Sequence, residues 1–452
     1  MNKIKKIFCV ALAAAVLSAT AFASGGFGAG NIVCSQTPRD AQSASLRWSK
    51  KLGSSYRDAP SSPLIVNDTM LVMSGRTLYK LRLADGEILA SAKMKDTPSY
   101  SYTPPTYSDG VVYCPLDNAI IQAFDYETLT PLWVYRDPLG GQSLTQIVCS
   151  SGRLFTGFWN DEEETANYVC LDTEDPDPTR EDEEKAAQWT YPHKGGFYWA
   201  KCVVRGQSVV FGGDDSTAYD NADSTLKSLD IKTGRLIDTV NIKGDQRSGV
   251  IYCSETDSLM FVTKAGYFYS VKIKADGKFD KVSLKSLTLG GASTSTPCVY
   301  NGRAYAGVQG RGFGEGSIQV IDCVNMKKIY SVKTKGYPQN SVLLSCGYEN
   351  QDSKVYIYST YNASPGGICV FSDSASQRSA TAEDLFIPPE TSRNYSVDTI
   401  VSGGDGTLYY KNDSGYIFAV ENTNAKIPDC YGILRIIKMF VNVIYRILGI
   451  SG

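Results

Sequence analysis

Short apolar stretches, each followed by a tight turn and a second apolar stretch, recur along most of the chain. Residues 299–302 read Val-Tyr-Asn-Gly and lead directly into the apolar residues 303–308, and residues 107–110 read Tyr-Ser-Asp-Gly and lead into residues 111–115. Asn-Gly or Asp-Gly between two such stretches is a strong signal of a β-hairpin. The pattern predicts a chain of short antiparallel strands.

A third apolar stretch follows each hairpin and ends at a recurring position, often Asp, before another turn. The marked positions are Arg82, Asp125, Asp172, Asp230, Lys272, Asp322, Ser372 and Glu421. Their spacings of 43, 47, 58, 42, 50, 50 and 49 residues suit four-stranded propeller blades. The repeat predicts an all-β fold, an eight-bladed β-propeller spanning residues 46–425.

The ends of the repeat predict how the ring closes. The last copy, at residues 416–421, stops without an outer strand, and residues 46–52, Leu-Arg-Trp-Ser-Lys-Lys-Leu, resemble an outer strand without a blade. Trp48 in that stretch corresponds to Trp133 and Trp189 in the second and third copies. We therefore expect the N-terminal strand to complete the last blade, which removes exposed sheet edges.

The order strand, Asp, turn with Thr-Gly, strand with Trp resembles the propeller family named for pyrroloquinoline quinone. The resemblance rests on residues such as 228–236 and 123–133 and extends from Trp48 to Thr423. Copies five, seven and eight have lost the Asp, and the first copy has Arg82 at that position. The resemblance implies an eight-bladed ring. The family includes quinone-dependent alcohol dehydrogenases and the lipoprotein of the outer-membrane β-barrel assembly machine, so the fold does not fix the function.

The resemblance to the dehydrogenases does not extend to their cofactor site. Those enzymes share an adjacent pair of cysteines near the quinone, which this chain lacks, and the chain has no Cys-x-x-Cys-His haem motif. We expect no cofactor and no bound quinone, and the closer similarity is to the assembly lipoprotein.

The N-terminus predicts export to the cell envelope or the extracellular space. Lys3, Lys5 and Lys6 precede an apolar run at residues 7–16, and Ala-Phe-Ala at residues 21–23 offers a cleavage site. We interpret residues 1–23 as a signal peptide and residues 24–45 as a linker. The net charge of −2 gives no attraction for nucleic acid.

The 12 cysteines lie mostly among apolar residues of predicted strands. Free cysteine behaves as a small buried hydrophobic residue. We therefore expect mostly free, buried thiols, while export leaves disulfides open.

Few residues suggest catalysis or metal binding. The single histidine, His193, stands before the fourth blade without a Gly-x-Ser-x-Gly motif, so a loop or strand-edge role is expected. Residues 160–185 hold 12 of the 47 acidic residues, yet without the order of an EF-hand loop. We interpret this segment as a solvated loop; Ca²⁺ binding there is the alternative.

Two aromatic segments are candidate ligand contacts. Phe197, Tyr198 and Trp199 are expected to begin an inner strand near the channel mouth, where aromatic rings stack on a sugar or hold a peptide, and strand alternation turns half of them into the core. Arg311 and Phe313 lie in the glycine-rich residues 307–316, which predict a long hairpin.

The tail, residues 426–452, predicts an amphipathic helix. Arg435, Lys438, Asn442 and Arg446 follow each other at helical spacing on one narrow face, and the rest, including Phe440, is largely apolar. We expect Arg435, Lys438, Phe440 and Arg446 to contact a membrane surface or a partner; packing against the propeller is the alternative.

Together these features predict an exported, non-enzymatic binding or scaffold propeller that presents its loops and central funnel to a protein or glycan partner. The alternative is a cryptic enzyme, a quinone-dependent dehydrogenase or a lyase, that uses the funnel.

Overall fold

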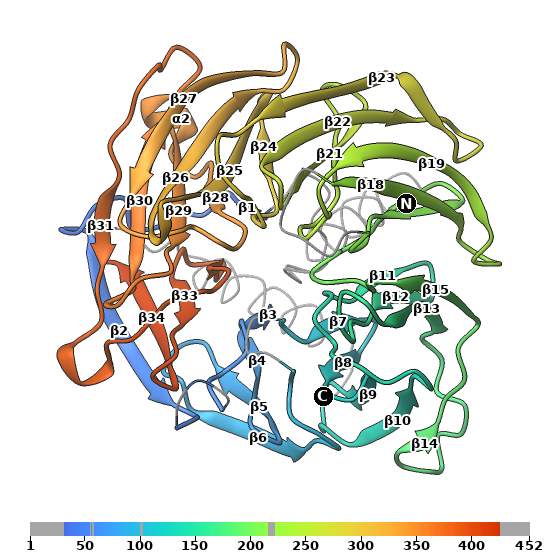
Figure 1. Ribbon diagram of the computed structural model, residues 1–452. Helices are drawn as coiled ribbons and strands as arrows, with labels where there is room; N and C mark the ends of the chain where they lie inside the picture. Colours follow the sequence, from blue (N-terminus) through green and yellow to red (C-terminus); the bar gives the residue numbers. More distant parts are fainter. Residues whose placement is uncertain (1–30, 55, 57, 100–102, 216–221, 425–452) are drawn as a thin grey trace, which may run out of the picture.

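The computed structural model describes residues 31–424 except 55, 57, 100–102 and 216–221. Eight β-sheets stand as blades around a central axis (Figure 1). The expected all-β, eight-bladed propeller is therefore confirmed. The predicted signal peptide and the predicted tail helix, with Arg435, Lys438, Phe440 and Arg446, lie outside the described residues. Within the described part, no helix is long and apolar enough to cross a membrane.

Within each blade the strands follow the order of the sequence from the centre outwards. The first four blades are formed by β3 (Leu64–Val66), β4 (Thr69–Ser74), β5 (Thr77–Arg82) and β6 (Ile88–Lys93); β7 (Thr106–Ser108), β8 (Val111–Leu116), β9 (Ile120–Asp125) and β10 (Pro131–Arg136); β11 (Val148–Ser150), β12 (Arg153–Gly157), β13 (Thr165–Asp172) and β15 (Trp189–Lys194); and β16 (Val203–Arg205), β17 (Ser208–Phe211), β18 (Asp223–Asp230) and β19 (Leu236–Lys243).

The last four blades repeat this arrangement, and two of them receive a strand from the N-terminus. They are formed by β20 (Ile251–Cys253), β21 (Ser258–Thr263), β22 (Tyr267–Ile273) and β23 (Phe279–Thr288); β24 (Cys298–Tyr300), β25 (Arg303–Gly310), β26 (Gly312–Asp322) and β27 (Lys327–Thr334); β28 (Leu343–Ser345), β29 (Val355–Thr360), β30 (Ile368–Asp373) and β31 (Glu383–Phe386) with β1 (Asn31–Val33); and β32 (Val401–Ser402), β33 (Leu408–Lys411) and β34 (Tyr416–Asn422) with β2 (Ala44–Lys51). Two short helical turns, α2 (Glu349–Asp352) and η1 (Glu390–Ser392), lie in loops.

The burial pattern follows from the stacking of blades. All residues of β4, β21 and β29 are buried, whereas β15 alternates between exposed and half-buried or buried positions and β6 has no buried residue. Middle strands have a neighbouring blade on each face and are therefore largely apolar, while outer strands meet solvent. Eight apolar clusters each combine residues of two adjacent blades, including the last and the first. The ring is therefore closed by a continuous core.

The marked position of the repeat lies at the end of the third strand of a blade, or one residue before it. Asp125 Oδ1 accepts hydrogen bonds from the backbone N and Oγ1 of Thr128, and Asp230 Oδ1 does the same with Thr233. The Asp therefore shapes the turn to the outer strand, which explains why it recurs in the sequence.

The tryptophans of the outer strands join one blade to the next. Trp48 Nε1 donates to Leu83 O at 2.9 Å, and Trp189 Nε1 donates to Ile231 O at 3.1 Å. In each case the acceptor belongs to the following blade. Trp48 thus connects the last blade to the first, as the N-terminal strand was predicted to do.

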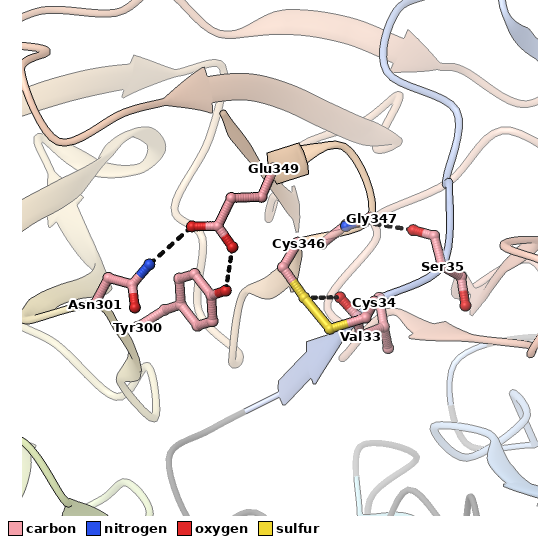
Figure 2. Close-up of a disulfide and its surroundings, with 9 residues drawn as sticks. Val33, Cys34, Ser35, Tyr300, Asn301, Cys346, Gly347 and Glu349 are labelled. Atoms are coloured by element: carbon pink, nitrogen blue, oxygen red, sulfur yellow. Dashed lines mark hydrogen bonds between the residues drawn. A yellow bond between two sulfur atoms is a disulfide. The ribbon is translucent and has the colours of Figure 1, made fainter. Parts of the chain in front are cut away.

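Closure involves more of the N-terminus than the sequence indicated. β2 pairs antiparallel with β34, which confirms the prediction, but β1 also pairs parallel with β28 in the seventh blade. A disulfide joins Cys34 to Cys346 beside this pair (Figure 2). From residue 31 onwards, the segment that we interpreted as a linker is therefore part of the ring.

The remaining described cysteines agree with the prediction of mostly free thiols. Eight are free, and all but the half-buried Cys149 are buried. The Cys34–Cys346 bond, between residues 312 apart in sequence, was not predicted.

The acidic segment is more ordered than the solvated loop that we expected. Its middle part is β13, a strand of the third blade, and β14 (Glu183–Glu184) pairs parallel with the outer edge of β10. Lys185 donates to Asp172 Oδ1 at 2.6 Å and lies 4.8 Å from the ring centre of Trp133. No group of three His, Cys, Asp or Glu in the described residues could hold a metal ion.

Candidate functional site

The two faces of the ring carry different kinds of connection. Because the strands of a blade are antiparallel, the turns after the first and third strands lie on one face, and the connections after the second and fourth strands lie on the other. The first face holds the short turns that define the repeat. The second face, here called the loop face, holds the segments around residues 159–164, 195–202, 244–250 and 309–313.

The loop face contains a cavity of about 630 Å³ over the third to seventh blades. We call it the aromatic cavity, because its wall includes the side chains of Trp159, Tyr198, Trp199, Phe313 and Tyr337. These residues come from the β12–β13 loop, the loop before β16, strand β26 and the loop after β27. The blades thus bring together residues that lie up to 178 positions apart in the sequence.

The predicted ligand contacts divide between this cavity and other places. Tyr198, Trp199 and Phe313 line the aromatic cavity. Phe197 is fully buried in the core between the third and fourth blades. Arg311 is exposed at the turn between β25 and β26, a long hairpin as predicted, and is not among the cavity residues. The expectation that residues 197–199 begin an inner strand is wrong, because they form the loop before β16.

Three rings of the aromatic cavity, those of Trp159, Tyr198 and Trp199, are held edge to face. Trp159 and Tyr198 have ring centres 5.0 Å apart at 79°, and Tyr198 and Trp199 have ring centres 4.8 Å apart at 77°. Phe313 and Tyr337, also in the cavity wall, have ring centres 6.4 Å apart at 33° and are tilted, and Phe313 is 56% exposed. Such edge-to-face contacts are favourable and leave ring faces available to a ligand.

A buried ion network centred on Arg247 contacts the ring of Tyr198. The guanidinium of Arg247 lies 4.5 Å from the ring centre of Tyr198. It donates to both carboxylate oxygens of the buried Asp214, at 3.1 and 2.5 Å, and to Glu162 at 2.9 Å. A bidentate pair of this kind fixes the plane of the guanidinium and so the ring on it.

Lys264 is a second cation in the wall. Its burial, together with the positive charge of Arg247, lowers the pKa of the Lys264 ammonium to about 8. Desolvation disfavours the charged form of a lysine. At neutral pH the ammonium therefore holds its proton more weakly than an exposed lysine does.

Trp199 connects the aromatic cavity with the central channel, since it lines both. Its φ of 57° is in the left-handed region, which is unfavourable for a bulky aromatic residue. Strained backbone of this kind persists where the surroundings hold it, and it gathers at binding sites.

The central channel encloses a small cavity of about 100 Å³. Seven blades contribute the residue two positions before their first strand: Ser62, Pro104, Gln146, Lys201, Thr296, Ser341 and Thr399. In the fifth blade this position is Gly249, where a Cβ atom would lie 3.5 Å from Cδ of Lys201. Burial lowers the pKa of Lys201 to about 7. The channel wall is thus mostly neutral and polar, with one buried amine.

His193 lies on β15, outside both cavities, in agreement with a strand-edge role. Its Nε2 is 2.6 Å from Oδ1 of Asp215. Burial opposes ionisation of Asp215, but the contact with His193 and the charge of Lys227 hold the pKa of that carboxyl well below its usual range. The pair therefore stabilises a loop rather than a cavity wall.

Sequence reasoning noted Glu162 only as one of the acidic residues of the segment 160–185, and it missed Trp159, Arg247 and Lys264. Each lies in a loop whose only sequence signal is its position in the repeat, between the second and third strands or before the first strand. Counting repeat positions would have placed these loops on one face. It would not have selected these residues from the many polar ones there.

Comparisons with known proteins agree with this geometry. The class of protein is an eight-bladed propeller with a cavity on its loop face. Residues 40–158 match a family model described as outer membrane protein assembly factor BamB. This match and the fold of the ring support a PQQ-like propeller family for the chain, as the repeats indicated. No curated protein matches the sequence.

Several solved structures share the fold. A quinohemoprotein alcohol dehydrogenase from Comamonas testosteroni has 13% identity over 87% of this chain and 79% of its own, with a TM-score of 0.61. BamB from Moraxella catarrhalis has 13% identity over 84% of this chain and 99% of its own, with a TM-score of 0.55. A europium-containing methanol dehydrogenase has 10% identity over 87% and 96%, with a TM-score of 0.64. At these identities the similarity shows the fold alone.

The residues present do not fit a bound quinone in the manner that the resemblance to the dehydrogenases implies. The disulfide of the described chain joins the distant Cys34 and Cys346, and neither lines the channel or the aromatic cavity. Arg247, a cavity cation, is already bound to Asp214 and Glu162. The absence of a cofactor stays a prediction.

Proposed function

We propose that this protein is an exported, non-enzymatic binding propeller that takes a protein or glycan partner into the aromatic cavity of its loop face. The observation that carries the proposal is the convergence of Tyr198, Trp199 and Phe313 on one cavity. Concave sites lined by aromatic side chains and a few polar groups are the usual form of a ligand site on a rigid scaffold.

The polar groups of the aromatic cavity favour binding over catalysis. Arg247 and Glu162 are bonded to each other, and Arg247 also holds the buried Asp214. Groups in such pairs orient the side chains that they hold. His193, the one histidine, pairs with Asp215 and is not a cavity residue.

The family match supports a partner in the cell envelope. The matched family is described as an outer membrane protein assembly factor, and BamB from Moraxella catarrhalis shares the fold. An envelope location also agrees with the signal peptide predicted for residues 1–23. A scaffold that holds a partner at its loop face agrees with both the family match and the predicted export.

Site-specific photo-crosslinking in native envelopes tests the proposal. Phe313, which is exposed at the cavity, is replaced by a photoreactive phenylalanine analogue, and Val282, which is exposed on β23, is replaced in a control. We expect a discrete adduct at position 313 that disappears when Tyr198→Ala is added, and none at position 282. Equal labelling at both positions, or labelling unaffected by Tyr198→Ala, would contradict the proposal.

A further inference from the structure

The aromatic cavity combines ring faces with side-chain amides. Gln142, Gln309 and Gln339 line it together with the hydroxyl-bearing Thr294. An amide both donates and accepts hydrogen bonds, which is what a ligand rich in hydroxyl groups requires. The C–H face of a sugar ring is apolar and stacks on an aromatic ring, while its hydroxyl groups point outwards to such amides.

We propose that the partner held in the aromatic cavity is an uncharged glycan, whose pyranose rings stack on Tyr198, Trp199 and Phe313. This inference rests on the proposed function and specifies its ligand. The three glutamines then bind the hydroxyl groups at the edge of the sugar.

The charges of the cavity disfavour an anionic ligand. Arg247 is compensated by the carboxylates of Asp214 and Glu162. Lys264 also has an interaction partner, so neither side chain is a free cation. A polyanionic polysaccharide or a phosphate group needs uncompensated cations to offset its loss of hydration.

A second observation concerns two buried polar atoms of the wall. Trp159 Nε1, a donor, and Gln142 Oε1, an acceptor, have no hydrogen-bond partner in the described residues. Their backbones are joined by two hydrogen bonds, of 2.7 and 3.0 Å, which hold the residues side by side. A sugar hydroxyl both donates and accepts, so it matches this pair once a side-chain rotation uncovers the two atoms.

The wall also differs from a peptide-binding groove built on a sheet edge. An extended peptide commonly adds to an open strand and gains backbone hydrogen bonds. Most residues of the aromatic cavity come from loops, and β25 and β26, which contribute Gln309 and Phe313, already pair with each other. The ligand therefore has to be recognised by side chains.

Titration of the full chain tests the inference. The probes are neutral hexasaccharides of glucose, mannose and xylose, an acidic oligogalacturonate, and a library of extended peptides. Binding is followed by calorimetry and by tryptophan fluorescence, since Trp159 and Trp199 lie in the wall. We expect a neutral hexasaccharide to bind, and Tyr198→Ala and Phe313→Ala each to raise its Kd by about tenfold or more.

Tyr395→Ala is the matched control, because Tyr395 is an exposed aromatic outside the cavity. It should leave the Kd unchanged. Binding of only the acidic or only the peptide probes, with the same dependence on Tyr198, would overturn the glycan inference and leave the proposed binding function intact. Failure of every neutral probe to bind, or equal binding by Tyr198→Ala, also overturns the glycan inference. The proposed binding function is tested separately, by the photo-crosslinking at position 313.

Discussion

At the scale of single residues, Lys201 is a basic side chain buried in the wall of the central channel. It occupies the channel position that seven other blades fill with neutral residues, and it is 9% exposed. Burial lowers the pKa of its ammonium to about 7. A lysine in this state loses its proton on folding at moderately alkaline pH, so it links stability to pH.

Replacing Lys201 by Met should change the pH dependence of unfolding. Between pH 7 and 10.5 the unfolded chain holds the lysine proton and the folded chain releases it, so raising the pH stabilises the folded state. We expect the free energy of unfolding of the parent protein to rise relative to Lys201→Met by about 1 kcal/mol per pH unit in this window. Urea unfolding at several pH values measures this, and parallel curves for the two proteins would show that Lys201 keeps its proton on folding.

The candidate site shows which residues a sequence can reveal. Tyr198 and Phe313 were singled out because Tyr198 belongs to a run of three aromatic residues and Phe313 lies in a glycine-rich segment. Arg247 and Lys264 could not, because their roles depend on partners in other loops, such as Asp214 and Tyr198. Phe197 was predicted with its neighbours, but it packs in the core because one of three consecutive aromatic side chains faces inwards.

At the scale of elements, the turn glycines serve two different purposes. Gly302 has a φ of 73° in a turn where a Cβ atom would meet nothing within 4 Å. Gly234 has a φ of 68°, and a Cβ atom there would lie 2.6 Å from Cδ2 of Trp189 in the preceding blade. The first glycine permits a conformation, and the second also makes room for a contact between blades.

Alanine at these two glycines should separate the effects. Gly302→Ala is expected to cost about 1 kcal/mol, the penalty of a left-handed residue. Gly234→Ala adds the displacement of Trp189 from its hydrogen bond to Ile231, so a loss of about 2–4 kcal/mol is expected. Urea unfolding of both variants measures the difference. Equal losses would mean that Trp189 moves aside without cost.

The sequence predicted those elements whose residues act within their own turn, and missed those that depend on a distant strand. The end of each third strand could be located because Asp125, Asp230 and their equivalents act within their own turns. The pairing of β1 with β28 and of β14 with β10 could not, because a two- or three-residue strand without a turn has no local signal. The acidic composition around β14 even suggested a solvated loop.

At the scale of the whole molecule, the N-terminus secures the ring at two neighbouring blades. β2 supplies the outer strand of the eighth blade, and β1 supplies an extra inner strand to the seventh (Figure 1). Between them, Thr37 and Tyr358 share a hydrogen bond of 2.7 Å, and Tyr348 donates to Thr37 O at 2.8 Å. The disulfide fixes this segment to the seventh blade, directly after β28.

A graded series of changes should show how much each part of this closure contributes. Cys34→Ser removes a covalent loop of 312 residues and is expected to lower the free energy of unfolding by about 2–4 kcal/mol. Deleting residues 24–52 also removes β2, leaves the edge of β34 open and empties the site of Trp48, so the loss should be clearly larger, by about 3–5 kcal/mol or more.

Reductant provides the internal control for this series. Because the other cysteines of the described chain are free, reduction should lower the melting temperature of the parent protein to that of Cys34→Ser and leave the variant unchanged. Thermal melting with and without reductant measures both effects. If the deletion of residues 24–52 melted like the parent protein, closure would depend on the contacts between the first and eighth blades alone, which include Ile65, Leu81 and Ile417.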